Sequence, residues 1–479
     1  MDTSSFGEQS ARPLAPRHFV LLALATAAGL ATGCAQYRSA PISASLQADS
    51  LEMRTLDDPR LQAFIAANAQ APAASATPWD LGRLTLAALY YHPDIEIARS
   101  KLALANAAKI TASQIPNPTA SVDLGSSPWS ISPAINFLIE TFGKREFRTA
   151  QAQALIEAAR QDLATAAWQV RGRVRAALLN LWAAQQRSGF LQARLALQDQ
   201  LVQLLERRLA EGEASSLDVT RERINRNQAS LALRDAERQA ADSHAQLATA
   251  IGVPVQALEN LPLSFDAFVS PQFQFIDTAE LRRLALTGRS DVQGLLAEYR
   301  AAESAVRLEI AKQYPNLTIG PGYTYETSSG TYELTLAAAA EVPVFNHNQG
   351  PIAEAEARRR GLGGQVLSLQ AQIVGAIDTA SASYRSASAT LATANALVED
   401  ASRRNGQISR SFEAGEADRP TLVTAGIELA IAELSRFEAD VQERQATGAL
   451  EDALQRRLFE PEADFPIPGD SLPQSEPTP

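Results

Sequence analysis

The chain has 479 residues, of which 46% are hydrophobic and 20% are charged, and its net charge at pH 7 is −11. This composition excludes a chain that is disordered throughout, because such chains combine low hydrophobicity with high net charge. The acidic balance, without a stripe of Lys and Arg, argues against nucleic acid as a partner. The length allows two or three ordinary domains.

The first residues are typical of a secretory signal. Two arginines precede an apolar run over residues 19–30, and small residues then lead to Cys34, the single cysteine of the chain. The run is shorter than a membrane-spanning helix. The segment resembles a bacterial lipoprotein lipobox, with Ala31 where Leu is usual, and this resemblance implies that Cys34 carries a lipid anchor in the outer membrane. The alternative is an ordinary signal peptide followed by a chance cysteine.

Three short motifs recur about 200 residues apart. Self-similarity at a fixed separation indicates a duplicated structural unit and takes precedence over local propensity. The sequence therefore predicts two tandem repeats that build the same structure side by side. The matched motifs are His92-Pro93-Asp94 with Ser290-Asp291, Ile115-Pro116-Asn117-Pro118 with Tyr314-Pro315-Asn316-Leu317, and Gly212-Glu213-Ala214 with Gly415-Glu416-Ala417.

Each repeat is predicted to hold a hairpin of very long helices. The first helix of repeat one has no Pro over residues 147–209, which at 1.5 Å per residue gives about 95 Å. Gly212 is expected to end it, because Gly adopts a left-handed C-terminal cap easily. The remaining expected helices are a short one near 59–67 in an otherwise extended segment, one ending near Tyr91, one from Pro93 to before Pro116, one capped by Ser215, Ser216 or Asp218 that runs to about Ile251, and those over 351–413 and 420–458.

Each long hairpin is preceded by a pair of strand-like segments in which apolar and polar residues alternate. A period of two indicates a strand with one apolar and one polar face. Strands are predicted over 119–125 and 135–141, with a loop at 126–133, and over 317–325 and 332–336, with a loop at 326–331. The apolar sets are Ala120, Val122, Leu124; Ile135, Phe137, Ile139; Leu317, Ile319, Tyr323, Tyr325; and Tyr332, Leu334, Leu336.

Strands of this kind suit a transmembrane barrel, which exposes apolar side chains to lipid and polar ones to its interior. A barrel has to close, because lipid cannot satisfy the hydrogen bonds of a free sheet edge. Four strands are too few, since known barrels begin at about eight. The sequence thus predicts that several copies of the chain share one barrel.

The chain resembles the TolC family of outer-membrane efflux channels over about residues 78–458, and within it the heavy-metal (CzcC-like) branch. The resemblance rests on the two Pro-Asn motifs, the paired Gly-Glu-Ala turns, and the segments 140–145 and 342–350. It implies a mainly α fold with a small transmembrane β part, in which a homotrimer forms a twelve-stranded barrel and a periplasmic helical tunnel. It also implies a periplasmic adaptor and an inner-membrane pump of the resistance-nodulation-division type as partners, besides outer-membrane lipid.

This interpretation divides the chain into five parts. They are a signal peptide (1–33), a lipidated extended segment (34–77), repeat one (78–270), repeat two (271–458) and a disordered tail (459–479).

No catalytic, cofactor or metal constellation is predicted. The four histidines are scattered, and neither a phosphate-binding Gly-Lys-Ser/Thr loop nor a His-Glu-x-x-His motif is present. Soft metals prefer thiolate, thioether or imidazole ligands, which do not cluster here. His347 is interpreted as a turn residue at a strand-helix junction rather than as a ligand. An enzyme is not expected.

The helical tips are the predicted functional residues, because in the family they resemble the aperture that meets the adaptor; the alternative is that they are merely good turns. An acidic pair narrows the tunnel in some relatives, and Thr421 and Thr424 stand at that place here, with Glu416, Asp418 or Glu428 as possible acidic substitutes. Four aromatic residues near strand ends favour the membrane interface; simple strand propensity is the alternative. The tip residues are Gly212, Glu213, Ala214, Leu217, Asp218, Gly415, Glu416, Ala417 and Thr421, and the aromatics are Trp129, Tyr323, Tyr325 and Tyr332.

The sequence-based conclusion is an outer-membrane exit duct of a tripartite efflux pump that carries divalent heavy-metal cations passively. A duct for drugs or other small organic molecules is the alternative with the same fold. A periplasmic coiled-coil lipoprotein without a pore is the alternative of another class, and it does not need the alternating strands.

Overall fold

The computed structural model describes residues 37–68, 78–126, 129–268 and 277–458. The chain divides into two compact units, 1–53 and 54–479, and the first contributes one described helix, α2 (Ala44–Glu52). The second unit contains the two repeats. Its helices and strands are α3 (Pro59–Asn68), α4 (Leu81–Tyr91), α5 (Pro93–Ser113), β1 (Thr119–Ser126), β2 (Trp129–Ile139), α6 (Lys144–Ala210), α7 (Ser216–Ile251), α8 (Thr278–Gly288), α9 (Ser290–Ala311), β3 (Leu317–Glu326), β4 (Thr331–Ala340), α10 (Gln349–Glu413) and α11 (Arg419–Leu454), with 3₁₀ turns at Val255–Leu258 and Asp266–Phe268.

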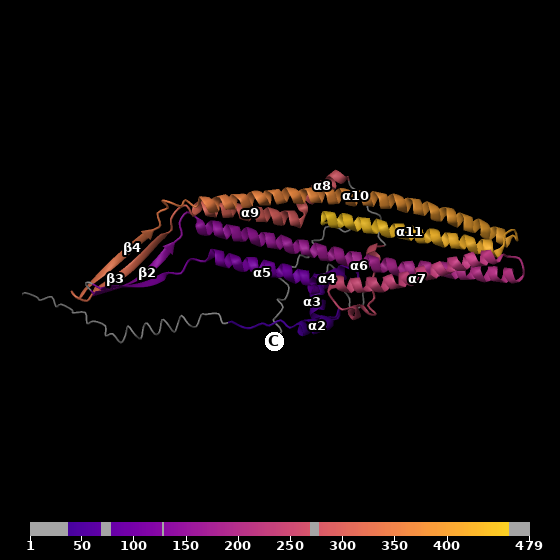
Figure 1. Cartoon of the computed structure of the whole chain (residues 1–479), viewed down its shortest axis with the longest axis horizontal. Helices are drawn as coiled ribbons and strands as arrows, with labels where there is room; N and C mark the ends of the chain where they lie inside the picture. Colours follow the sequence, from indigo (N-terminus) through magenta and orange to yellow (C-terminus); the bar gives the residue numbers. More distant parts are fainter. Residues whose placement is uncertain (1–36, 69–77, 127–128, 269–276, 459–479) are drawn as a thin grey trace, which may run out of the picture. The chain divides into compact units, whose positions relative to one another are not determined.

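The long helical hairpins are confirmed. Helices α6 and α10 contain 67 and 65 residues, and the returning helices α7 and α11 contain 36 each. Each long helix packs against its own returning helix, while α6 also packs against α9 and α11 and so joins the two repeats. Within the second unit, the sheet lies at one end of these helices and the tips of both hairpins lie at the other (Figure 1).

The four strands form one antiparallel sheet in the order β1-β2-β3-β4. The pairs β1-β2 and β3-β4 are the hairpins of the two repeats, and β2-β3 joins them, with Phe137 opposite Ile319 and Ile139 opposite Leu317. In this chain, therefore, one strand of each repeat pairs with the other repeat, and one strand of each repeat forms a sheet edge.

Three predicted strand limits are wrong, namely both ends of the strand expected over 135–141 and the end of the strand expected over 332–336. Strand β2 begins at Trp129 and ends at Ile139, so most of the expected loop at 126–133 is strand. Pro133 suggested a turn, but it lies in the strand opposite Val122, and the recorded pairing with β3 skips from Ile131 to Ala134. A residue without an N–H group interrupts a ladder without ending the strand. Strand β4 extends to Ala340, because four alanines continue it beyond the alternating residues.

The segment before the first repeat is less extended than expected. The predicted helix near 59–67 is confirmed as α3, whereas α2 was not predicted. No residue of α2 is buried. The helix therefore has no buried apolar stripe, which is the sequence pattern by which a helix is usually predicted. The expected signal peptide, Cys34 and the expected tail all lie outside the described residues.

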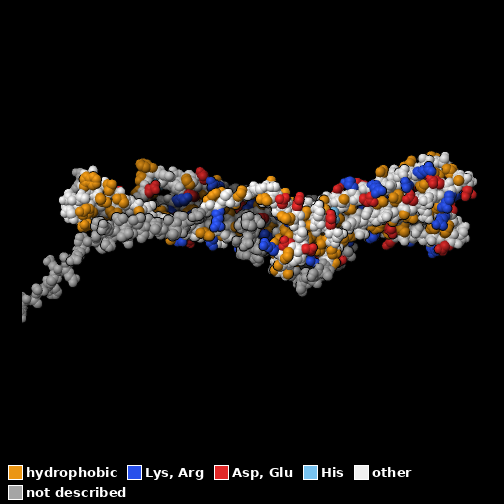
Figure 2. All heavy atoms as spheres, turned by 90° about the horizontal axis from the view of Figure 1, so that it is seen from below, with side chains coloured by type: hydrophobic (Ala, Val, Ile, Leu, Met, Phe, Trp, Pro, Cys, Tyr) orange, Lys and Arg blue, Asp and Glu red, His pale blue; other side chains and the backbone are white. Residues whose placement is uncertain are grey.

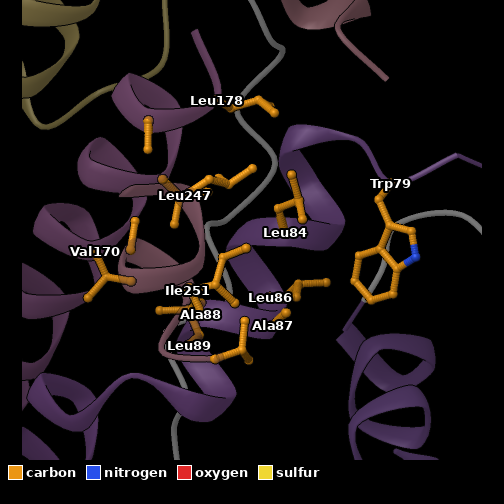
Figure 3. Packing of buried hydrophobic residues seen from close by; sticks show 14 of the residues in the cluster. Trp79, Leu84, Leu86, Ala87, Ala88, Leu89, Val170, Leu178, Leu247 and Ile251 are labelled. Atoms are coloured by element: carbon orange, nitrogen blue, oxygen red, sulfur yellow. The ribbon is translucent and has the colours of Figure 1, made fainter. Parts of the chain in front are cut away.

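The largest hydrophobic core lies where the helices of repeat one meet (Figure 3). Leu84 and Leu89 of α4, Leu178 of α6, and Leu247 and Ile251 of α7 are fully buried there. Burying a Leu or Ile side chain stabilises a fold by about 1.5–3 kcal/mol relative to leaving it exposed. The core thus fixes α4 against the long hairpin. None of the helices among the described residues combines the length and apolar character needed to cross a membrane.

Candidate functional site

The sheet has two chemically different faces, as the alternation predicted. Successive side chains of a strand point to opposite faces, and the register decides which residues of neighbouring strands share a face. One face is apolar, and the other consists of small and polar residues apart from Leu138, which lies opposite Thr318. The apolar face contains Val122 and Leu124 of β1, Ile131, Ile135, Phe137 and Ile139 of β2, Leu317, Ile319, Tyr323 and Tyr325 of β3, and Tyr332, Leu334 and Leu336 of β4. The opposite face contains Ser121, Asp123, Ser130, Ser132, Asn136, Thr318, Gly320, Gly322, Thr324, Glu333 and Thr335.

The polar face is closely packed at its glycines. A Cβ atom added to Gly320 would lie 2.1 Å from Oδ1 of Asn136, and one added to Gly322 would lie 2.7 Å from Oγ1 of Thr335. Ser132 and Thr324 exchange a hydroxyl hydrogen bond of 3.0 Å across β2 and β3 on the same face. Small residues therefore let polar side chains of the neighbouring strands lie across this face.

Three of the four predicted interface aromatics, the tyrosines, come together on the apolar face, at the end of the sheet farthest from the long helices. The ring centroid of Tyr332 lies 4.8 Å from that of Tyr325 and 5.5 Å from that of Tyr323. Trp129 begins β2 opposite Ser126 and is 63% exposed. Trp129 thus begins β2 at the same end of the sheet as the three tyrosines, although it lies about 200 positions from them in sequence.

Both outer strands expose their side chains. Every residue of β4 is exposed, and Thr119, Ala120, Val122 and Leu124 of β1 are exposed as well. Apolar side chains gather at the sheet end of the second unit, whereas acidic and basic ones mix over the helices near the tips (Figure 2). Exposed apolar patches mark a binding surface for protein or lipid.

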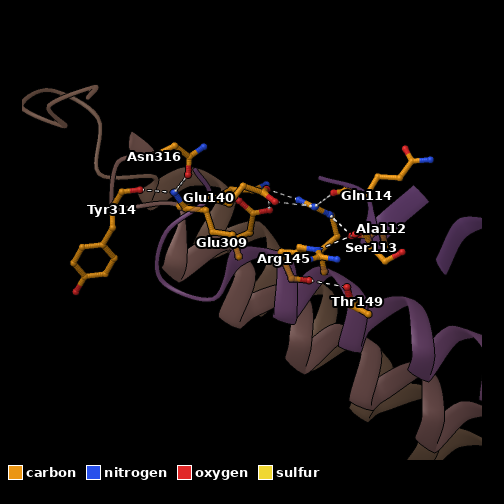
Figure 4. A network of polar contacts seen from close by, with 12 residues as sticks. Ala112, Ser113, Gln114, Glu140, Arg145, Thr149, Glu309, Tyr314 and Asn316 are labelled. Atoms are coloured by element: carbon orange, nitrogen blue, oxygen red, sulfur yellow. Dashed lines mark hydrogen bonds and ion pairs between the residues drawn. The ribbon is translucent and has the colours of Figure 1, made fainter. Parts of the chain in front are cut away.

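The junction between β2 and α6 is held by a buried lysine, whose partners Tyr314 and Asn316 are shown in Figure 4. The ammonium group of Lys144 donates hydrogen bonds of 2.6 Å to the carbonyl of Tyr314 and to Oδ1 of Asn316. The hydroxyl of Thr141 donates to the carbonyl of Pro315. Desolvation lowers the pKa of Lys144. The junction of repeat one therefore binds the Pro-Asn motif that begins β3 in repeat two.

Two arginines in the first turns of α6 bind the end of α5. Arg148 forms a bidentate pair with Glu140, with N–O distances of 2.6 and 3.0 Å, and donates to the carbonyl of Ala112. Arg145 donates to the carbonyl of Ser113. These bonds satisfy carbonyls that a helix C-terminus leaves without intrahelical partners.

The roles of Lys144, Arg145 and Arg148 were not predicted from the sequence. A signal was present, because basic residues in the first turn of a helix oppose its dipole and are unfavourable there without another partner. Three such residues within five positions indicate that the start of α6 faces acceptors from other segments.

The two helical tips have nearly the same geometry. Gly212 and Gly415 have φ angles of 78° and 79°, and each turn is closed by a backbone bond from the next residue, Glu213 to Arg208 and Glu416 to Ser411. A left-handed glycine with this bonding terminates helices efficiently. Of the predicted tip residues, all are exposed except Ala214 and Ala417, which are partly buried.

An ion pair joins the two tips. The guanidinium of Arg208, at the end of α6, lies 2.7 Å from the carboxylate of Asp418 and 3.7 Å from that of Glu213. Asp418 also caps α11 by accepting from the backbone N–H and the hydroxyl of Thr421. The Thr421 bonds, together with the Arg208 guanidinium, hold the pKa of Asp418 below its usual range. Asp418, absent from the predicted tip residues, therefore connects one hairpin to the other.

The residues expected to narrow the tunnel lie on one helix beside two shallow hollows. Thr421 and Thr424 line a hollow of about 240 Å³. Glu428 lines a second hollow of about 380 Å³ and lies 2.7 Å from Arg404, which borders both. The carboxylate of Glu428 is thus already paired with a cation of the same chain.

In the part of the chain that the structure describes, no three His, Cys, Asp or Glu side chains come together as a metal site would require. His347 is exposed in the turn before α10, where its backbone N–H donates to the side chain of Gln349. Its position agrees with the predicted turn at a strand-helix junction.

Residues 91–253 match the family described as "Outer membrane efflux protein". The cobalt-zinc-cadmium resistance protein CzcC of Cupriavidus metallidurans is 26% identical over 239 residues, which are 49% of this chain and 56% of that protein. The pyoverdine export outer membrane protein OpmQ of Pseudomonas aeruginosa is 26% identical over 227 residues, 46% of this chain and 47% of that protein. The chain thus spans about half the length of these relatives.

Solved structures agree on the fold. The outer membrane protein VceC of Vibrio cholerae superposes with a TM-score of 0.62 at 18% identity, covering 79% of this chain and 96% of that one. A membrane protein of Pseudomonas aeruginosa gives a TM-score of 0.64 at 18% identity, with coverages of 78% and 90%. The predicted mainly α fold with a small β part, and the resemblance to the outer-membrane efflux channels, are therefore confirmed.

Proposed function

We propose that this protein is the outer-membrane channel subunit of a tripartite efflux pump and forms a passive exit duct for divalent heavy-metal cations. The observation that carries the proposal is the amphipathic sheet, which has an apolar face, a polar face and two exposed outer strands. A soluble coiled-coil tether does not need such a sheet.

The sheet supports a trimer by the requirement for closure. Free N–H and C=O groups at a sheet edge are costly in lipid, so a spanning sheet has to become a barrel. The four strands of one chain fall short of the smallest barrels, of about eight strands, while three copies supply twelve. The apolar face then contacts lipid, and the polar face lines the water-filled interior.

The remaining site assignments follow from this arrangement. The aromatic group at Tyr332 suits the lipid-water interface. The exposed tips, 67 helical residues or about 100 Å from the start of α6, are the surface offered to a periplasmic adaptor and through it to an inner-membrane pump. Thr421, Thr424 and Glu428 are the proposed narrow point of the tunnel near these tips. Lipidation of Cys34 would add a membrane anchor, and loss of radiolabelled palmitate from a Cys34→Ser variant would test it.

The cargo is supported by the relative named for cobalt, zinc and cadmium resistance and by the net charge of −11, which favours cations near the protein. A second candidate cargo is a small organic molecule, because the other relative is named for pyoverdine export. The pump, rather than this duct, would select between them.

Two experiments test the proposal. Purified protein in a planar bilayer should give discrete conductance steps, and a rod without conductance at any voltage would support the tether instead. Deletion of the gene should sensitise cells to cobalt, zinc or cadmium salts. Sensitivity to dyes or antibiotics, with unchanged tolerance of metals, would support the organic cargo.

A further inference from the structure

Each repeat contains a joint at which the returning helix of its hairpin ends beside the start of the helix that leads to the sheet. In repeat one α7 ends beside the start of α5, and in repeat two α11 ends beside the start of α9. Helices α7 and α11 have 36 residues each, and the residue after each helix, Gly252 or Gln455, has a left-handed backbone with φ of 87° or 49°. The two joints are therefore counterparts that can be compared residue by residue.

Repeat two closes its joint with its own side chains. The side chain of Gln455 accepts hydrogen bonds of 2.9 and 2.7 Å from the backbone N–H and the hydroxyl of Ser290 at the start of α9. In the other direction, the guanidinium of Arg289 donates to the carbonyl of Ala453 in the last turn of α11. Asp291 holds this guanidinium by a bidentate pair with N–O distances of 3.0 and 2.6 Å. Both helix ends thus gain partners for groups that have none within the helix.

Repeat one lacks both of these side chains. His92 stands where Arg289 stands in repeat two, and its Nδ1 accepts from a backbone N–H of its own helix, α5. Gly252 stands where Gln455 stands. A Cβ atom added to Gly252 would lie only 3.2 Å from the carbonyl oxygen of Tyr91, because the end of α7 and the end of α4 approach closely. A side chain at this position is therefore disfavoured, and the joint needs a donor from elsewhere.

Arg54 supplies this donor. Its Nη1 donates to the carbonyl of Gly252 at 2.7 Å and to that of Tyr91 at 3.0 Å, so one group caps the ends of α7 and α4 together. The guanidinium lies 5.4 Å from the ring centroid of Tyr91, and the hydroxyl of Tyr91 donates to the carbonyl of Thr55 at 2.8 Å. Leu56 follows in the main core and is 2% exposed. Charged donors of this kind form the stronger hydrogen bonds of a protein.

We infer that Arg54 is a clasp that closes the joint of repeat one from outside the repeat, whereas repeat two closes its joint with its own Arg289. Arg54 directly follows Met53, the last residue of the first compact unit. A displacement of the N-terminal segment would therefore loosen the base of the α6-α7 hairpin and leave the base of the α10-α11 hairpin closed. The clasp is independent of the proposed trimer and cargo.

Hydrogen exchange followed by mass spectrometry can observe the two joints separately in the full-length protein in detergent. Arg54→Ala should raise the exchange rate of amides at the end of α7 several-fold and leave the end of α11 unchanged. Arg289→Ala should have the reverse effect. Arg60→Ala removes an exposed arginine of the neighbouring helix α3 and is the matched control, which should change neither joint.

Unchanged exchange at the end of α7 in Arg54→Ala would overturn the clasp. An equal rise at both joints would also overturn it, because Arg54 would then support the whole fold rather than one joint. Should Arg54→Ala fail to fold, Arg54→Gln and Arg289→Gln, which keep a shorter donor, are compared in the same way.

A second substitution tests the correspondence between the joints. Adding His92→Arg to Arg54→Ala returns a guanidinium to the position that Arg289 occupies in repeat two. Protection from exchange at the end of α7 should then return in part. Protection that stays lost would refute the view that Arg54 replaces a cation which repeat one lacks.

Discussion

The two strand-to-helix junctions of this chain descend from one unit but are built differently. In repeat one, Lys144, Arg145 and Arg148 bind carbonyls of α5 and of the segment before β3. In repeat two, Asn348 contacts Glu309 of α9, while Phe345 and its apolar neighbours Val342 and Val344 are exposed.

The difference follows from what each junction faces. The first junction faces the other repeat of the same chain, so its polar groups have partners at fixed positions. The second junction follows β4, an outer strand, and its neighbour in the proposed trimer is another copy. The two repeats therefore share the same backbone arrangement, whereas their junction side chains differ according to whether the neighbouring segment belongs to the same chain or to another copy.

The largest expected effect on stability comes from breaking a buried ion pair of α6, for which an exposed ion pair of α10 serves as the comparison. Arg171 of α6 lies 3.1 Å from Glu451 of α11, with side chains 7% and 6% exposed, whereas Arg282 pairs with Asp378 of α10 and both are 42% exposed. Glu451→Gln leaves a buried guanidinium without its carboxylate and should cost about 3–5 kcal/mol. Asp378→Asn should cost at most about 1 kcal/mol.

Thermal unfolding of both variants, followed by circular dichroism in detergent, provides the measurement. The melting temperature should fall far more for Glu451→Gln. Equal shifts would show that the buried pair does not hold the two repeats together.

A smaller effect is expected at the junctions themselves. Arg148→Ala removes a bidentate pair and a bond to the end of α5, and charge-assisted hydrogen bonds contribute about 1.5–3 kcal/mol each. Its counterpart experiment is Asn348→Gly, which keeps the left-handed backbone (φ 58°) and removes the amide bonds to Glu309 at about 1 kcal/mol. Urea unfolding should give Arg148→Ala a lower free energy of unfolding than Asn348→Gly. The reverse order would contradict the proposed difference between the two junctions.

Much of this fold follows from sequence patterns that involve one element at a time. The period of two in residues 317–325 predicts β3, and the stretch without Pro over 147–209 predicts α6, because both depend on local geometry. The tips are also local, since Gly212 and Gly415 end their helices by their own conformation.

The missed features depend on pairs of elements. The contact between Lys144 and Asn316 joins residues 172 positions apart, and no pattern within either segment specifies it. Asp418 resembles an ordinary helix cap, and its second partner, Arg208, is brought near by the packing of α6 on α11. The prediction of a loop that includes Pro133 was wrong for a similar reason. A proline disrupts strand pairing only toward the neighbouring strand that would accept a hydrogen bond from its missing N–H group, and the sequence does not show which neighbour that is.

The starts of α5 and α9 should differ in pH dependence. His92 caps α5, its Nδ1 accepting from the N–H of Asp94 at 3.2 Å, whereas Arg289 stands at the same place before α9. Burial and the nearby Arg173 lower the pKa of His92. The unfolded chain therefore takes up this proton first, and stability should fall as the pH drops below the ordinary value of about 6.5.

His92→Asn keeps a capping side chain without a titrating group. Between pH 8 and pH 5 the melting temperature should decline more steeply for the natural protein than for this variant. The corresponding extra loss in the free energy of unfolding should be at most about 1 kcal/mol, which is the contribution of one helix cap. Parallel curves of melting temperature against pH would show that His92 does not cause the loss of stability at low pH.

The smallest effect on stability is expected at the tips. Asp418 joins one hairpin to the other, and Asp218 lies at the corresponding start of the returning helix in the first tip. Asp418→Asn keeps the cap but removes the charge facing Arg208, and exposed pairs contribute about 0.2–1 kcal/mol. Asp218 receives a hydrogen bond from the hydroxyl of Ser215, so Asp218→Asn is the matched control.

The Asp418 effect should weaken in 0.5 M salt, because salt screens exposed charges. It should also vanish in acid: a carboxylate with a lowered pKa contributes its stability above the unfolded value of about 3.9 and loses it as the pH falls through the folded value. A salt-dependent difference for Asp218→Asn of the same size would assign the effect to general tip charge rather than to the Arg208 pair. A difference confined to Asp418→Asn would make this ion pair a specific link between the hairpins, one that a partner docking at the tips could displace at little energetic cost.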